Sequence, residues 1–346
     1  MSTLTPRDGR DPVEGSGPAP AVVRGPAPAG QVIRFVAMRL GGLLLTMFVA
    51  SVVVFSALHL APGSVISFLT KGRSVSDEAL AELNAQYHLD QPVIVQYVLW
   101  LRDAGTGDLG HSIVYNLPVS SILGSRIPAT VTLLVMAAVL VLVIGLGLGI
   151  VAGLKPNALT RLAMTGATIS MAVPVFVAAA VLTLVFAVGL GWFPVFGTGT
   201  GFWDTLYHNV LPAVSLALAS IAFVGRLSQT AIRTELASDH VNTAISRGLP
   251  HRLVMSRHVV RNAAIPMLTV AGLSIAGLLA GSVIVEQVFQ LNGLGTLLVN
   301  AVQQKDFPVV QAVSLVYVAA FIVLNTLIDV TYTLLDPRVS MNGDRS

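Results

Sequence analysis

The Asp, Glu, Lys and Arg residues leave six long windows without a formal charge, and these windows limit what this chain can fold into. Each window is longer than twenty residues; they cover residues 40–70, 127–154, 162–203, 205–225, 262–285 and 307–328. A helix that crosses about 30 Å of hydrocarbon needs about 20 apolar residues. Each window is therefore long enough to hold a membrane-spanning helix.

The composition agrees with a membrane protein. Charged residues make up only 11% of the 346 residues, and 54% are hydrophobic, whereas about 25% of an average soluble domain is charged. This shortage excludes an ordinary soluble globule of this length. The chain contains no cysteine, which excludes disulfides, thiolate metal sites and cysteine nucleophiles.

The window 162–203 is long enough for two helices, but its second half is rich in glycine and interfacial aromatic residues, as in a loop. We therefore expect an all-α integral membrane fold with six transmembrane helices, at about 39–60, 129–153, 165–188, 209–229, 264–286 and 309–333. Residues 1–31 are rich in Pro, Gly and Ala and predict a disordered tail, so that 32–346 forms the membrane domain. The first span is longer than the apolar region of a signal peptide, and we expect an uncleaved anchor.

The basic residues fix the expected orientation. If the N-terminus is cytoplasmic, the inside segments hold fifteen Lys and Arg residues and the outside segments hold five, with nine acids outside. Because cytoplasmic loops carry the excess of Lys and Arg, we expect both termini in the cytoplasm. The basic residues then reflect membrane orientation, and they do not indicate a nucleic-acid partner.

The outside insertion 61–128 is expected to hold two short helices. The first begins after Ser76, an N-cap residue, and carries apolar side chains at helical spacing. The second runs from about Pro92 to Trp100, and the glycine-rich stretch 105–110 predicts a turn. On these features alone, the insertion is a small helical cap that packs on the bundle.

The inside segment 226–262 predicts a short amphipathic helix that lies parallel to the membrane. Asp239 can cap this helix, and Gly248 and Pro250 end it. Its apolar stripe consists of Val241, Ala244, Ile245 and Leu249, and a basic collar surrounds it, formed by Arg233, Arg247, Arg252, Arg257 and Arg261. Two interpretations stay open: an interfacial helix that binds lipid headgroups, and a docking element for a cytoplasmic partner.

Several kinds of chemistry have no support in the sequence. None of the three lysines follows a glycine, so a P-loop for ATP is excluded, and the seven histidines include no His-Glu-x-x-His pattern of a zinc protease. Asp329 is a formal charge within a predicted span, which makes it a candidate for substrate contact. An interhelical hydrogen bond or partial hydration explains it equally well. Pro174 and Pro266 can bend the third and fifth spans for gating, or have no gating role.

The segment from Asp239 to Leu249, with its Ala244 and Gly248, resembles the "EAA" loop of bacterial ABC-importer permeases. More narrowly, the chain resembles the dipeptide/oligopeptide (and nickel) permease family, of the first-subunit type with a long periplasmic insertion after the first span. The resemblance extends over about 33–340 and includes short motifs in the same order, at 60–63, 89–92, 107–112, 126–130, 211–216, 281–286, 293–295, 306–311 and 335–338. His240 and Asn242 depart from this family, because a Tyr and a basic residue are more usual there.

The resemblance implies a non-enzymatic permease subunit in the bacterial inner membrane. Such a subunit forms half of a pathway for peptides with a second homologous permease, and its coupling helix docks on one of two cytoplasmic P-loop ATPases that bind ATP and Mg²⁺. An external solute-binding protein delivers the substrate, and lipid surrounds the bundle. The coupling residues carried over are Asp239, Thr243, Ala244, Arg247 and Gly248, with Ala244 allowing close approach to the partner. The chain itself is expected to hold no cofactor. Nickel chelates or another small solute stay open as substrates, and a stand-alone channel or an ion-coupled carrier is the alternative of a different class.

Overall fold

The computed structural model describes residues 29–59 and 90–335, and the side chains of 41–56 and 90–328. Within these ranges all regular secondary-structure elements are helices, and an isolated β-bridge joins His111 to Pro118. The helices are α1 (Ala29–His59), α4 (Val93–Thr106), α5 (Val119–Leu140), α6 (Gly147–Leu154), α7 (Ala158–Ser170), α8 (Val175–Leu182), α9 (Phe202–His208), α10 (Val210–Leu236), α11 (Asp239–Ser246), α12 (His251–Leu253), α13 (Arg261–Val288), α14 (Leu294–Gln304) and α15 (Phe307–Leu335). Three π-helical segments continue neighbouring α-helices: η1 (Val141–Leu146), η2 (Thr183–Gly189) and η3 (Val254–Val260).

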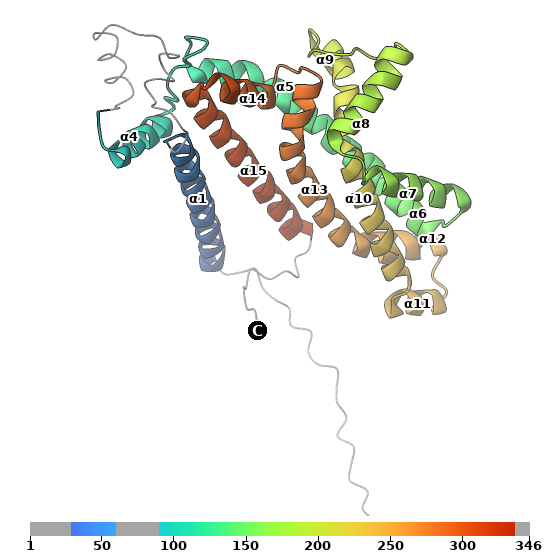
Figure 1. Ribbon diagram of the computed structural model, residues 1–346. Helices are drawn as coiled ribbons and strands as arrows, with labels where there is room; N and C mark the ends of the chain where they lie inside the picture. The colour runs from blue at the N-terminus through green and yellow to red at the C-terminus, as the bar shows by residue number, and fades with distance from the viewer. Residues whose placement is uncertain (1–28, 60–89, 336–346) are drawn as a thin grey trace, which may run out of the picture.

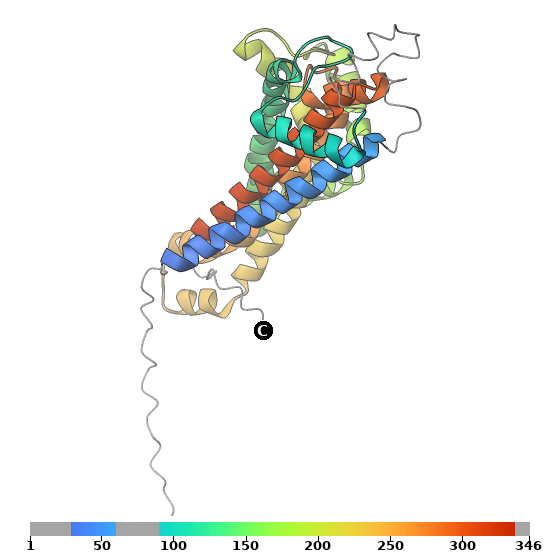
Figure 2. The same cartoon turned by 90° about the vertical axis from the view of Figure 1, so that its left-hand side faces the viewer.

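The helices form an elongated bundle (Figure 1). Helices α9 and α14 lie at one end of this bundle, here called the α14 end, and α11 lies at the other, the α11 end. Helix α1 lies alongside α15 in both side views (Figures 1 and 2). The central helix is α10, which packs against α5, α6, α7, α8 and α13.

The prediction of an all-helical fold is confirmed for the described residues, but fewer than the six predicted spans are found among them. Four continuous helical segments are long and apolar enough to cross a membrane: Val119–Leu154, Val210–Leu236, His251–Val288 and Phe307–Ile328. The bent pair Ala158–Ser170 and Val175–Gly189 brings the number to five if it counts as one span. Helix α1 contributes a shorter apolar stretch, Gly41–Ser56.

The helices extend beyond most of the predicted spans. The second span begins at Val119, ten residues before the prediction, so the end of the expected insertion 61–128 is helical. The ends of the expected coupling loop 226–262 likewise belong to α10 and to the helix that starts at His251. A charge-free window marks only the part of a helix that crosses the hydrocarbon core of the membrane. The helix can continue beyond that part, because its ends lie in water.

A break at Pro174 corrects the prediction of one continuous third span. Helix α7 ends at Ser170, Pro174 is the N-cap of α8, and the two helices are bent by 114°. A proline inside this helix would clash with the carbonyl of Ser170 and lacks an N–H for it. The residue before a proline also avoids the helical region. The chain therefore turns at residues 171–174 before α8 begins.

Helix α4 begins at Val93, where the sequence predicts the second outside helix, but it continues six residues past Trp100. It ends at Gly107, whose φ of 90° is left-handed. The predicted tail 1–31 falls almost entirely outside the described residues, and so does the predicted helix that follows Ser76.

Glycines permit a close contact between α10 and the continuous helix formed by η1 and α6. Gly145, Gly149 and Gly153 recur every four residues and face α10. A Cβ atom at Gly149 would lie 2.6 Å from the carbonyl oxygen of Gly225, and one at Gly153 would lie 2.6 Å from the side chain of Ile232. Small residues at this spacing let membrane helices approach closely, so that backbone packing holds them together.

Candidate functional site

Helix α11 is fixed to the α11 end of the bundle by its apolar side. Val241 and Ala244 are buried, with exposed fractions of 0% and 5%. They pack in a cluster with the buried side chains of Ile232, Val254, Val259, Ala263 and Met267, which come from α10, η3 and α13. The short helix is therefore a rigid part of the bundle, because three longer segments hold one of its faces.

A glycine turn ends α11. Gly248 has a φ of 73°, and its N–H donates to the carbonyl of Ile245 at 2.9 Å. The N–H of Leu249 donates to the carbonyl of Ala244 at 3.3 Å. This pair of bonds is a Schellman motif, which needs a left-handed residue at the position of Gly248. The sequence predicts Asp239 as the cap of this helix, and this is wrong. The N-cap is Ser238, and Asp239 lies in the first turn.

The predicted coupling residues do not share one face. Asp239, Thr243, Arg247 and Gly248 are exposed, whereas Ala244 points into the chain's own core. The small size of Ala244 therefore permits close approach of α11 to α10 and η3, which corrects the expectation that this residue faces a partner. The apolar stripe also divides: Ile245 and Leu249 remain exposed, at 54% and 36%.

A polar cluster that the sequence did not reveal joins α11 to its neighbours. The Nε2 atom of His240 lies 2.8 Å from Oε1 of Glu235, at the end of α10. Asn262, in α13, donates from Nδ2 to the same oxygen at 3.1 Å. His240, which departs from the usual residue of the resembled family, thus has a partner within this chain. The cluster ties three helices together at the point where α11 leaves the bundle.

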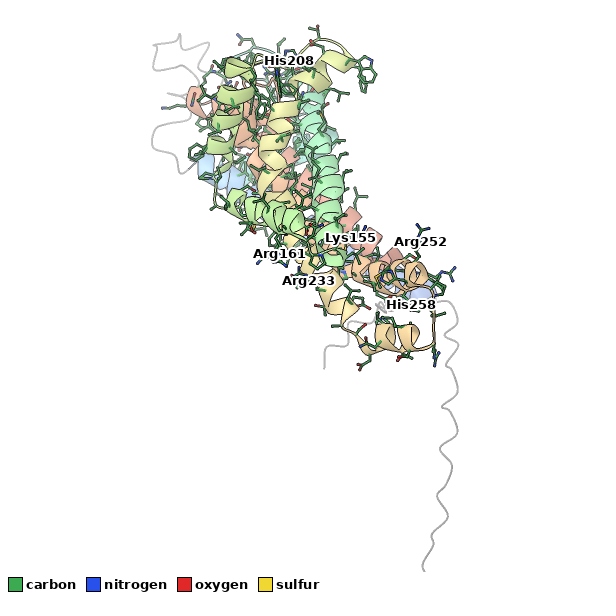
Figure 3. All side chains as sticks on the ribbon, turned by 90° about the vertical axis from the view of Figure 1, so that its right-hand side faces the viewer. Lys155, Arg161, His208, Arg233, Arg252 and His258 are labelled. Atoms are coloured by element: carbon green, nitrogen blue, oxygen red, sulfur yellow. The ribbon has the colours of Figure 1, made fainter. Side chains whose placement is uncertain are left out.

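Basic side chains surround α11. All five arginines of the predicted collar are exposed. Figure 3 shows Arg233 and Arg252 toward the α11 end together with Lys155 and Arg161, whereas His208 lies at the opposite end. The α11 end is therefore the basic end of the described bundle.

At the other end of the bundle, a buried carboxylate caps α14. Oε1 of Glu286, on α13, accepts a hydrogen bond from the hydroxyl of Thr130 at 2.6 Å. Its Oε2 accepts from the N–H groups of Gly295 at 2.7 Å and Thr296 at 3.2 Å. The Thr130 hydroxyl oxygen accepts from the N–H of Leu294 at 2.8 Å. The first N–H groups of a helix lack partners within it, and here side chains of α5 and α13 supply them.

Two glycines make room for this cap. Gly293 is the N-cap of α14 and has no side chain of its own to offer. A Cβ atom there would lie 2.7 Å from the hydroxyl oxygen of Thr130, and one at Gly295 would lie 3.0 Å from Oε2 of Glu286. The Gly-Leu-Gly motif at 293–295 therefore allows the carboxylate to reach the backbone of α14.

A second buried carboxylate follows the other end of α14. Asp306 is 1% exposed and accepts hydrogen bonds from the Ser112 hydroxyl, from the N–H of Ile113 at 3.2 Å and from the N–H of Val114 at 3.3 Å. These bonds hold the turn at 112–117 against the junction of α14 and α15. Glu286 and Asp306 belong to the nine acids counted as external, yet both are buried and neither contributes to a surface charge.

The other candidate positions are distributed along the bundle. Pro174 breaks the third span, as described above. Pro266 lies inside α13, within the continuous segment that begins at His251. Asp329 belongs to α15, but its side chain lies outside the described part of the chain. Asp329 is not alone among formal charges in the predicted spans, because Glu286 lies in α13 and Arg226 in α10.

Two family models together match most of the chain. The binding-protein-dependent transport system inner membrane component matches residues 145–341, which include α11 and both buried carboxylates. The N-terminal part of such membrane components matches residues 32–134. The chain belongs to this family of transport permeases.

Similar proteins are named as permeases of peptide transport systems. The glutathione transport system permease protein GsiC of Escherichia coli O6:H1 is 35% identical over 309 residues, which cover 89% of this chain and 99% of that protein. The dipeptide transport system permease protein DppB of Alkalihalophilus pseudofirmus is 31% identical over 313 residues, covering 84% of this chain and 94% of that protein.

A solved inward-facing structure of the MetNI methionine ABC transporter matches the fold with a TM-score of 0.51 at 15% identity. The match covers 62% of this chain and 96% of that one. The protein is therefore a multi-pass permease component of an ABC importer, and the resemblance drawn from its motifs is confirmed. The members of its family are membrane components of transport systems. The described residues include no group of three or more His, Cys, Asp or Glu side chains that could hold a metal ion.

Proposed function

We propose that this permease forms half of a peptide pathway and is driven by a cytoplasmic ATPase through α11. The proposal rests on the way α11 packs against the bundle. One face of α11 is buried in a cluster with side chains from α10, η3 and α13, and the other face is exposed at the end of the bundle. A force applied to the exposed face would pass directly into two long helices, because packed interfaces move as units.

The permease would act with a second homologous permease and two P-loop ATPase subunits that bind ATP and Mg²⁺. Closure of the ATPase pair on ATP would move both α11 helices and turn the pathway toward the solute-binding protein, and hydrolysis would reverse the motion. The exposed residues Asp239, Thr243, Arg247 and Gly248 are the contacts we propose for the ATPase. Ala244 acts from beneath, by keeping α11 close to the bundle.

The orientation follows from the same assignment. With α11 in the cytoplasm, the basic collar faces the inside of the cell, both termini are cytoplasmic, and six spans cross the bacterial inner membrane, with α1 as the first. The fifteen-to-five distribution of basic residues supports this orientation. The turn at 112–117 and α14 would then face the external solute-binding protein, as a landing surface that Glu286 and Asp306 hold in shape.

The proposed substrates are small peptides. The relatives named above transport glutathione and dipeptides, and the alignments cover nearly the full length of both proteins. Nickel chelates or another small solute are the alternative within the same architecture. A stand-alone channel or an ion-coupled carrier is the alternative of a different class.

Reconstitution separates these functions. The permease is purified with its second permease and its ATPase subunits, inserted into liposomes, and supplied with the solute-binding protein and labelled di- and tripeptides. We expect peptide uptake that needs ATP and the binding protein. Uptake that is indifferent to ATP, or a permease that never co-purifies with P-loop subunits, would contradict the proposal. ATP-dependent uptake of a nickel chelate, without uptake of peptides, would show that the alternative substrate class is correct.

A further inference from the structure

Helix α4 exposes a row of apolar side chains that no described part of the chain covers. Ile94, Val98 and Leu101 are 78%, 57% and 37% exposed, and their spacing of four and three residues places them on one face of the helix. None of the fourteen residues of α4 is fully buried. An isolated helix of this length is marginal in water, so α4 needs a further apolar partner.

An adjoining face of α4 is attached to α1 by aromatic side chains. The ring of Tyr97 lies 5.3 Å from that of Phe55 and 6.3 Å from that of Phe48, edge to face in both cases. The Tyr97 hydroxyl also lies 2.7 Å from the Ser51 hydroxyl. The ring of Trp100 lies 5.7 Å from that of Phe55. The contact is therefore specific, and it fixes the position of α4 along α1.

The contact is made below the end of α1. Phe48 and Phe55 lie eleven and four residues before the last residue of α1, His59, which at 1.5 Å per residue is about 16 and 6 Å along the helix. Both belong to the apolar stretch Gly41–Ser56. Figure 2 shows α4 crossing the upper part of α1 at the α14 end of the bundle. Helix α4 thus lies beside the apolar part of α1 and not above it.

We infer that α4 is an in-plane membrane anchor whose Ile94–Val98–Leu101 face is inserted among the lipids of the leaflet at the α14 end. This face continues the exposed apolar surface of α1, where Leu45 and Val53 are 63% and 60% exposed. A surface helix with one apolar face is bound at the boundary between headgroups and acyl chains. The inference rests on the proposed function in one respect, the crossing of the membrane by α1.

The charged residues of α4 fit the same arrangement. Arg102 and Asp103 lie in its last two turns, next to Gly107, where the chain leaves toward the turn at 112–117. The long stem of an arginine can lie along an apolar surface while its charge stays in water. Helix α4 is then a lipid contact, and it stays separate from the landing surface proposed above, which consists of the turn at 112–117 and α14.

The absence of cysteine in the natural chain gives a direct test. Single-cysteine variants Ile94→Cys and Val98→Cys are labelled with an environment-sensitive fluorophore in the reconstituted complex. Thr106→Cys is the matched control, at an exposed polar position near the end of the same helix. Each label is quenched in turn by lipids that carry nitroxides on their acyl chains and by iodide in the water, and ATP-dependent uptake is measured on the same vesicles.

We expect the labels at 94 and 98 to be quenched by the nitroxide lipids more than by iodide, and the label at 106 to show the reverse order. Quenching by iodide at all three positions would overturn the inference. Protection from both quenchers would also overturn it, because a protein segment or a partner would then cover the face. Loss of lipid quenching when the binding protein is added would reassign the face to that partner. Lipid quenching without ATP-dependent uptake would leave the anchor in place and contradict the proposed function alone.

Discussion

Replacing Gly248 tests whether the shape of the α11 loop matters for coupling. Gly248 has a φ of 73°, and a Cβ atom there would meet nothing within 4 Å. A substitution therefore acts through the backbone alone. A left-handed conformation costs an ordinary L-residue about 1–2 kcal/mol, and a β-branched valine lies at the upper end of this range. A cost of this size shifts the ratio of the capped to the uncapped turn about 5- to 30-fold.

The expected order of variants follows from that cost. Asparagine tolerates the left-handed region, so Gly248→Asn should retain most of the peptide-stimulated ATP hydrolysis and uptake. Gly248→Ala should lose part of both activities, and Gly248→Val should lose the most. Size-exclusion chromatography of the purified complex should show unchanged assembly for all three, because a Cβ atom at this position meets no neighbour. Wild-type stimulation of hydrolysis in Gly248→Val would refute the role of this turn in coupling.

Three further predictions concern the rest of the bundle. Gly149→Ala places a methyl group against the Gly225 carbonyl and should destabilise the fold by about 1–3 kcal/mol, measured as a lower melting temperature in detergent. Gly147→Ala, with free space around it, should leave the melting temperature unchanged, and equal melting temperatures of the two variants would contradict the close α6–α10 contact. Thr130→Val leaves the N–H of Leu294 and one oxygen of Glu286 without this partner, at a cost of about 1–3 kcal/mol, and Thr130→Ser should restore the melting temperature; a harmless valine would contradict the capping role. Asp306→Ala should release the turn at 112–117, so that hydrogen exchange of the Ile113 and Val114 amides rises; unchanged exchange would contradict that contact.

The sequence predicted the membrane helices because every charge in hydrocarbon is costly, so charge-free windows mark the apolar part of each helix. It did not predict their ends, because hydrated residues extend a helix without any change in apolar pattern. The break at Pro174 was underestimated for a related reason. A proline in a membrane helix either bends it or ends it, and the choice depends on neighbouring helices that satisfy the freed backbone groups.

The candidate site was predicted in position but not in orientation. The stripe of Val241, Ala244, Ile245 and Leu249 identified an amphipathic helix, but a stripe does not tell how much of it a neighbour covers. The roles of Glu286 and Thr130 were missed, because the two residues lie 156 positions apart and meet only in the folded bundle. The Gly-Leu-Gly motif at 293–295 was the available signal, since adjacent glycines indicate a close approach of backbone to another group.

The central claim is that the exposed face of α11 docks on the ATPase while the permease's own helices hold the other face. Single cysteines at Thr243 and at the neighbouring Ala244, in a chain without other cysteines, test it by cross-linking in the assembled complex to cysteines in the ATPase surface groove. We predict that Thr243→Cys forms a cross-link whose yield changes between the ATP-bound and nucleotide-free states. The buried Ala244→Cys should form none. Equal yields at the two positions, or no cross-link at Thr243 in any nucleotide state, would contradict the account.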